Sequence, residues 1–285
     1  MNQEYIQFKK QRELGEIITS MFKFLRENYK DFSKNLIKIA GPALILLVAA
    51  LSYYSYTTLG MDFTDFFGGT GEFFISSIIM LLAYFFYSVT FTGTVYHIIK
   101  SYVNNNGEII AAEVTNGMKK DLGKLMLLGF LSGIMIFAGS MVFLIPGIYL
   151  SVPLSLASAI LVFKNEDVME SISESFRLIK DNWWITFFTL IVIWLLIYIV
   201  SLVFQLPAII YMFIKAITVV QEGSSADPSS IFDGVYLVIS IAASVIQYIL
   251  YCIIPVGIAF VYFNLNEKKN FTGTYETIQN LGKNS

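Results

Sequence analysis

The chain has 285 residues, of which 56% are hydrophobic, 16% aromatic and only 14% charged, with a mean hydropathy of +0.66 and a formal net charge of −2. Soluble domains usually carry about 25% charged residues, so this composition argues against a soluble protein and favours an integral membrane protein. Cys252 is the single cysteine, which rules out an internal disulfide.

Six apolar runs meet or approach the roughly 20 residues that a helix needs to cross about 30 Å of hydrocarbon. They are 37–56, 73–96, 125–144, 148–163, 183–204 and roughly 235–263. We therefore predict an all-α, polytopic helical membrane protein with about six spans plus amphipathic interfacial helices, in a single membrane domain over 1–285. The polar residues before the first run do not resemble a signal peptide.

Residues 125–163 and 183–220 are each too long to be one span, and the last run is also overlong. Residues 125–163 would form a helix of about 58 Å, so we predict two spans with a turn at Pro146 and Gly147. The last run contains Pro255, which predicts a kink, because proline removes a backbone hydrogen bond from a helix.

Residues 183–220 pose the same problem and contain Pro207. We expect the helix to bend there, so that 208–220 is either re-entrant or lies near the outer surface. If this segment crossed instead, the acidic loop after it would face the cytoplasm, against the charge rule for membrane proteins.

Lysine and arginine are unevenly distributed along the chain. Of the 19, eight lie before the first run or at its very start (Lys38 is its second residue), four lie between the second and third, three between the fourth and fifth, and three follow the last. Basic residues are retained on the cytoplasmic side. We therefore predict a multi-pass protein with both termini in the cytoplasm.

The sequence repeats itself on that predicted cytoplasmic side. EIITSMFKFLRENY at 16–29 aligns with ESISESFRLIKDNW at 170–183, and a fainter copy begins with GEII at 107–110. We predict parallel pseudo-repeat units, each an amphipathic helix followed by two spans. The units are about 14–99, 107–164 and 167–264, followed by a short cytoplasmic tail at 265–285.

The amphipathic helices are expected to lie in the headgroup plane with their apolar side against the acyl chains. Asn28 and Asn182 fall where each helix would turn into the membrane. Seven basic residues of these helices are the predicted contacts with anionic lipid headgroups. They are Lys23, Arg26, Lys30, Lys119, Lys120, Arg177 and Lys180.

The sequence lacks the motifs of the common catalytic sites. His97 is the single histidine, which excludes HExxH metal sites, and we interpret it as an interfacial hydrogen-bonding residue. No GxxxxGK[ST] phosphate loop and no GxSxG elbow are present. We predict no catalytic residues, no metal, no cofactor and no enzymatic activity.

The polar groups inside the predicted spans are uncharged. Gln205 and Gln247 lie near the proline positions and could coordinate a ligand at a helix break, or could hydrogen bond between helices. Small residues indicate faces for close helix packing. They are Gly129, Gly133, Ser151, Ser155 and Ala159.

The stretch PGIYLSVPLSLASAILVFKNEDVMESISESFRLIKDNWW at 146–184 resembles a segment of two bacterial membrane families. These are the membrane domain of glycerophosphodiester phosphodiesterases and the related YciC-like proteins of unassigned function. The residues that carry the resemblance are Ser171, Ser175, Leu178, Lys180 and Trp183. The resemblance implies a protein of the bacterial cytoplasmic (inner) membrane and does not carry over the phosphodiesterase activity, which belongs to a separate soluble barrel.

Two functions remain open from the sequence. The first is a non-enzymatic membrane module that binds membrane lipids or a membrane-protein partner. The second is a transporter or facilitator of a neutral or lipid-like solute that uses the breaks at Pro207 and Pro255. The lack of acidic residues inside the predicted spans favours the first. Nucleic acid is not expected as a partner.

Overall fold

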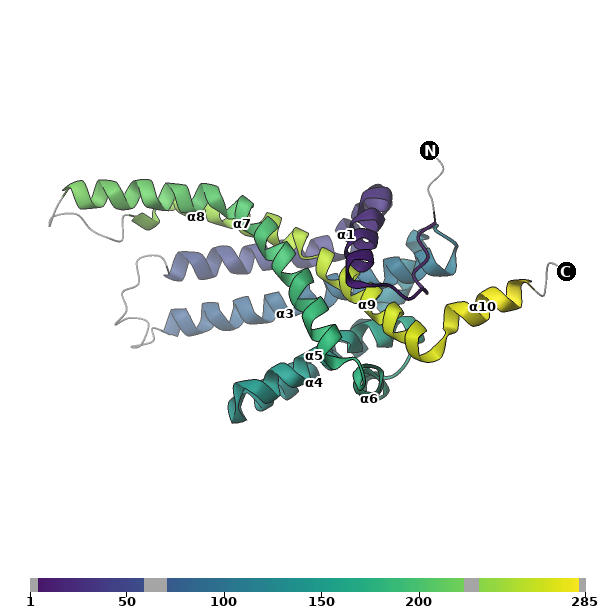
Figure 1. Ribbon diagram of the computed structural model, residues 1–285. Helices are drawn as coiled ribbons and strands as arrows, with labels where there is room; N and C mark the ends of the chain where they lie inside the picture. The colour runs from purple at the N-terminus through teal and green to yellow at the C-terminus, as the bar shows by residue number, and fades with distance from the viewer. Residues whose placement is uncertain (1–4, 59–70, 223–230, 282–285) are drawn as a thin grey trace. The chain divides into compact units, whose positions relative to one another are not determined.

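The computed structural model describes residues 5–58, 71–222 and 231–281, and they form helices joined by short connections (Figure 1). The helices are α1 (Leu14–Thr58), α3 (Gly71–Asn104), α4 (Ala111–Val142), α5 (Leu144–Lys164), α6 (Val168–Ile179), α7 (Trp183–Glu222), α8 (Gly234–Leu250), α9 (Ile253–Asn270) and α10 (Thr272–Leu281). Six helical stretches in these ranges are long and apolar enough to cross a membrane, with α8 and α9 counted as one. The prediction of an all-α protein with six span-length helices is confirmed.

The chain divides into two compact units. Unit 1 consists of Met1–Ala40, Val89–Leu195 and Cys252–Ser285, and unit 2 of Gly41–Ser88 and Leu196–Tyr251. The long helices α1, α3 and α7 each supply residues to both units.

The core of unit 1 is built around α5. Leu156, Ala157 and Ile160 have no exposed surface, and α5 packs against α4, α6 and α9. Figure 1 shows α4 and α5 as neighbouring teal helices joined at one end. In a bilayer such side chains stabilise the structure through close van der Waals packing between helices, so α5 is the packing centre of the unit.

The segment before α1 is also held in unit 1. Phe8 is completely buried, with its ring stacked on Phe260 at 4.3 Å between centroids and edge-on to Phe24 at 5.3 Å. The Ile6 backbone N–H donates to the Tyr102 hydroxyl at 2.9 Å. A segment without helix is therefore fixed in place by one aromatic anchor and a buried hydrogen bond.

Unit 2 consists of apolar helix segments with few polar contacts. The Thr57 hydroxyl donates to the Ser76 hydroxyl at 2.8 Å, and the Tyr87 hydroxyl donates to the Tyr248 carbonyl at 2.9 Å. Large apolar side chains are exposed on its helices, among them Ile45, Leu81, Leu82, Phe213 and Val238. Such a surface is stable in lipid and not in water.

The two copies of the sequence repeat differ in backbone structure. In the later copy α6 ends at Ile179 and α7 begins at Trp183, with Asn182 in the turn that was expected there. The expected turn at Asn28 is wrong, because α1 continues through it as one helix of 45 residues. The Asn28 side chain donates to the Phe24 carbonyl of its own helix at 3.0 Å, so its amide is satisfied without a helix end.

The turn between α4 and α5 lies at Phe143, not at Pro146 and Gly147 as predicted. Phe143 is extended, with φ −158° and ψ 153°. Pro146 falls in the first turn of α5, where an N–H has no partner within the helix and its loss costs little. A Cβ on Gly147 would overlap the Ser140 hydroxyl and lie 3.0 Å from the Ser140 Cα, so Gly147 permits the close crossing of α4 and α5.

The predicted small-residue faces are correct only in part. Nothing in the described chain lies within 4 Å of a Cβ built on Gly133, so it makes no close helix contact. Ala159 is fully buried, as expected of a packing position. Ser151 and Ser155 donate to carbonyls of their own helix, at 2.8 and 2.7 Å.

Pro207 and Pro255, where a bend and a kink were predicted, differ in their effect on the helices. Pro207 lies inside α7, which is a single helix of 40 residues, so the prediction that 208–220 could be re-entrant is wrong. The chain does break near Pro255, although the turn is at Tyr251 and Cys252. Pro255 occupies the first turn of α9, where proline is tolerated, and the helix before it has to end earlier.

Candidate functional site

The seven predicted lipid-contacting basic residues all belong to unit 1. Lys23 is half-buried, with its Nζ 4.0 Å from a Glu27 carboxylate oxygen. The other six are exposed: Arg26, Lys30, Lys119, Lys120, Arg177 and Lys180. They come from α1, α4, α6 and the turn that follows α6. Arg177 is paired with Glu174, and the other five exposed residues leave their charges available to an anionic surface.

One of the seven, Arg177, belongs to a network around a buried carboxylate. Glu174 on α6 is 8% exposed and is paired with Arg177 and with Lys164, whose Nζ lies 2.6 Å from Glu174 Oε1. Desolvation raises the pKa of Glu174, but hydrogen bonds from Arg177 and Lys164 outweigh it and hold the pKa below its usual value. Lys164 also lies 3.3 Å from Glu166. The network joins α6 to the end of α5.

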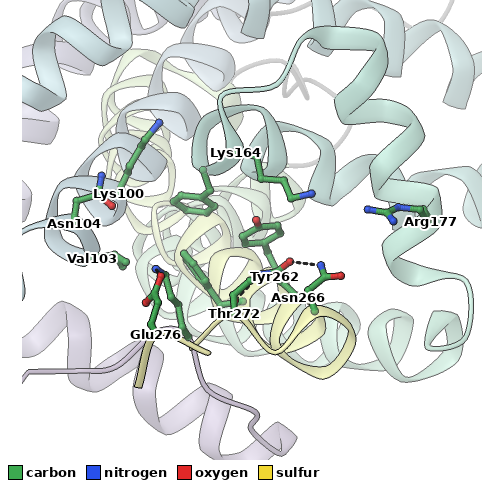
Figure 2. Close-up of a pocket in the computed structure, with 13 residues that line it drawn as sticks. Lys100, Val103, Asn104, Lys164, Arg177, Tyr262, Asn266, Thr272 and Glu276 are labelled. Atoms are coloured by element: carbon green, nitrogen blue, oxygen red, sulfur yellow. Dashed lines mark hydrogen bonds and ion pairs between the residues drawn. The ribbon is translucent and has the colours of Figure 1, made fainter. Parts of the chain in front are cut away.

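A cavity of about 420 Å³ lies beside this network in unit 1 (Figure 2). Its walls come from the segment before α1 and from α3, α5, α6, α9 and α10. The lining residues are Lys9, Lys100, Val103, Asn104, Phe163, Lys164, Arg177, Tyr262, Phe263, Asn266, Asn270, Thr272 and Glu276. Four of these are cationic and one is acidic. Figure 2 shows the side chains of Lys164 and Arg177 extending toward each other.

The floor of the cavity is formed by α9. Asn270 Nδ2 donates to Asn266 Oδ1 at 2.7 Å, and Asn266 Nδ2 donates to the Thr272 hydroxyl at 3.0 Å. Tyr262 is 3% exposed and stacks on Phe163, with 5.3 Å between centroids. The lining therefore combines aromatic rings with primary amides.

The two ends of the described chain meet at one wall of this cavity. Lys9 forms an ion pair with Glu276 of α10. A Cβ on Gly273 would overlap the Lys9 carbonyl oxygen, so only glycine allows this approach. The start of α10 is also held by Glu267, which accepts hydrogen bonds from the backbone N–H groups of Gly273 and Thr274 at 2.6 and 3.0 Å. This wall is therefore a close tertiary contact between the segment before α1 and the start of α10.

Lys100 of α3 is another cation of the cavity lining. Its Nζ donates to the Val162 carbonyl and to Asn165 Oδ1, the latter at 2.6 Å. Both acceptors are uncharged, and they lie at the C-terminal end of α5, where carbonyl groups lack helical partners.

His97 has a partner that the sequence did not reveal. It is 4% exposed, and its Nε2 lies 3.3 Å from Asp121 Oδ2, which is also buried. A Cβ on Gly117 would overlap the imidazole, so α4 packs directly on the ring. The two residues are 24 positions apart on different helices. The sequence signal for this contact was that Asp121 falls on the apolar face of α4, which indicates that its side chain is buried.

Gln205 and Gln247 lie together in unit 2. Gln205 Nε2 donates to Gln247 Oε1 at 3.0 Å, and Gln247 Nε2 donates to the Tyr251 hydroxyl at 2.6 Å. These bonds fit the interhelical role that was one of the two sequence-based interpretations.

No cluster of three or more His, Cys, Asp or Glu side chains that could hold a metal ion occurs in the described ranges. Cys252 is a free thiol at the turn between α8 and α9. The polar groups that line the cavity are four cations, one carboxylate paired with Lys9, primary amides, a threonine hydroxyl and one tyrosine hydroxyl, and the excess of cationic donors is suited to binding an anion.

Comparison with known proteins gives one match. The model of an "Uncharacterised protein family (UPF0259)" matches residues 71–222, which is more than half of the chain. No curated protein and no solved structure matches. The match names neither the YciC-like proteins nor the phosphodiesterase membrane domain, so that resemblance remains an expectation from the sequence.

Proposed function

The chain belongs to the uncharacterised protein family UPF0259, and we propose that it is a non-catalytic, lipid-binding module of the bacterial cytoplasmic membrane. In this proposal both termini face the cytoplasm. Anionic lipid headgroups gather around the basic helix ends of unit 1.

The observation that carries this proposal is the position of the exposed cations. Lys119 and Lys120 precede the apolar part of α4 by about one turn, and Lys180 lies in the turn just before α7. An apolar helix that spans the bilayer would hold such residues at headgroup level. Each basic residue near an anionic surface is worth about 1 kcal/mol, so several together enrich anionic lipid.

Transport of a neutral or lipid-like solute is the alternative. A transporter would need polar groups at helix breaks that are free to bind the solute. Gln205 and Gln247 are hydrogen-bonded to each other, and α7 has no break at Pro207. Both observations weigh toward the binding module. A protein partner in the membrane remains compatible with the same basic surface.

Lipid retained through gentle purification tests the proposal. Native mass spectrometry of the wild-type protein should show bound anionic lipid, and the double variant Arg26→Gln/Lys120→Gln should retain clearly less. The charge-preserving variant Arg26→Lys/Lys120→Arg is the matched control and should retain as much as the wild type.

Two outcomes would contradict the proposal. Wild-type protein without retained anionic lipid, combined with solute flux in proteoliposomes, would put the transport alternative ahead. Turnover of phospholipids or glycerophosphodiesters that follows the pure protein through gel filtration would show that the protein is an enzyme.

A further inference from the structure

We propose that the cavity of unit 1 is a discrete binding site for one phosphate ester group. This goes beyond the proposed function, because lipid enrichment by exposed charges needs no cavity. The phosphate could belong to a lipid headgroup or to a soluble phosphate ester, and both present the same chemistry to the site.

The charge of the lining favours an anion. Of the four cationic side chains, Lys9 is paired with Glu276, while Lys164 and Arg177 share Glu174. None of the ion pairs of the described residues involves Lys100, whose hydrogen bonds go to uncharged oxygens. The Asp121 carboxylate acts on Lys100 electrostatically without forming an ion pair, and the two hydrogen bonds leave the third donor of the ammonium group for an anionic ligand.

Tyr262 is the second, independent observation. Its side chain is 3% exposed, yet no hydrogen bond of the described residues involves its hydroxyl. Figure 2 shows Tyr262 in the middle of the cavity lining, between Lys164 and Asn266. The hydroxyl oxygen is not among the buried, unsatisfied polar atoms of the described residues, so it opens onto the cavity and can donate to an acceptor bound there.

The remaining lining matches a phosphate ester better than a bare ion. A phosphate group offers three acceptor oxygens and up to two negative charges, and Lys, Arg and amide donors surround the space. The amide of Asn104 likewise makes no hydrogen bond within the described ranges. Phe163 and Phe263 supply an apolar wall for the rest of the molecule, and about 420 Å³ is in the size range of small-molecule sites.

The site can be tested with two probes and matched variants of the full chain. The soluble probe is glycerol 3-phosphate, titrated against protein in neutral detergent. The lipid probe is phosphatidic acid at a few per cent in phosphatidylcholine nanodiscs. Tyr262→Phe removes the hydroxyl and keeps the aromatic ring, and it should weaken binding about tenfold. Tyr275 is exposed on α10, so Tyr275→Phe should have no effect. Lys100→Gln should weaken binding in the same way, and Lys10→Gln, on an exposed residue outside the cavity, should not.

Each outcome decides between the alternatives. Binding of both probes, or of glycerol 3-phosphate alone, supports the site with a soluble source, and binding of phosphatidic acid alone supports it with a lipid source. Binding of neither probe overturns the inference, as does equal weakening by Tyr262→Phe and Tyr275→Phe. Retained anionic lipid that responds to Arg26→Gln/Lys120→Gln, together with no effect of Tyr262→Phe on the binding of either probe, would leave the proposed function standing and remove the cavity site.

Discussion

The crossing of α4 and α5 makes a sharp prediction, because two glycines of the same hairpin have opposite surroundings. A Cβ on Gly147 would overlap the Ser140 hydroxyl and lie 3.0 Å from both the Cα and the Cβ of Ser140. The hydroxyl can rotate away, but the Cα cannot, so the helices must separate. Gly133 has open space where a Cβ would be.

The magnitudes follow from two effects. Overpacking of a tight contact costs about 1–3 kcal/mol, and alanine is favoured over glycine in a helix by about 1 kcal/mol. Gly147→Ala should therefore lose about 0–2 kcal/mol after the helix gain of about 1 kcal/mol is subtracted from the overpacking cost. Gly133→Ala should be neutral or gain up to about 1 kcal/mol. The difference between the two variants isolates the steric contribution.

The stability of both variants is measured by thermal unfolding in detergent, which is monitored as the loss of the monodisperse peak in size-exclusion chromatography. Each kcal/mol corresponds to roughly 2–4 °C in the midpoint for a chain of this size range, so Gly147→Ala should unfold several degrees below Gly133→Ala. Ser140→Ala combined with Gly147→Ala should restore only part of the loss, because the Ser140 Cα remains. A destabilising Gly133→Ala with a silent Gly147→Ala would refute the close crossing.

Two further predictions concern charge and topology. Hydrogen bonds hold the pKa of Glu174 below its usual value. Its contribution to stability is therefore full above the unfolded pKa of about 4.3 and is lost as the pH falls through the lower folded pKa. Unfolding midpoints measured between pH 6 and 3 should fall in the wild-type protein and fall less in Glu174→Gln, and an equal dependence of the midpoint on pH in the two proteins would contradict this prediction. In a Cys252→Ser background, an impermeant thiol reagent applied to intact cells should label a cysteine at Glu72 and not one at Gln11, and labelling of Gln11 would place the N-terminus outside.

The sequence was sufficient for the number of span-length apolar helices, because apolar runs and charge breaks are local properties of the chain, but most of these helices extend well beyond the predicted runs. It also placed the turn at Asn182 correctly. It failed at Asn28 and Phe143, where the outcome depends on packing. Asn28 is satisfied by its own helix, and Phe143 is selected as the turn because Pro146 and Gly147 are more favourable inside α5 than between the helices.

The candidate site was mostly beyond the reach of sequence patterns. Arg177 is the one predicted lipid contact that lines the cavity. Lys9, Lys100 and Tyr262 come from separate parts of the chain, and no periodicity relates them. The pairing of His97 with Asp121 was missed for the same reason. Contacts between distant segments are set by tertiary packing, which a single sequence does not encode in any short motif.

The family match covers one part of the cavity lining and leaves the other part outside it. Residues 71–222 contain Lys100, Lys164 and Arg177, while Lys9 and Tyr262 lie outside the match. If the cavity binds a phosphate ester, the matched region supplies most of its positive charge and the flanking segments supply the neutral donor and one wall. Charge determines whether an anion binds at all, whereas the hydroxyl and the wall determine which ester fits. Exchanging α9 and α10 for the corresponding segments of another family member should therefore change the preference between glycerol 3-phosphate and phosphatidic acid while phosphate binding persists. Complete loss of binding in a well-folded exchange variant would show instead that the cations of the matched region are not sufficient to hold the anion.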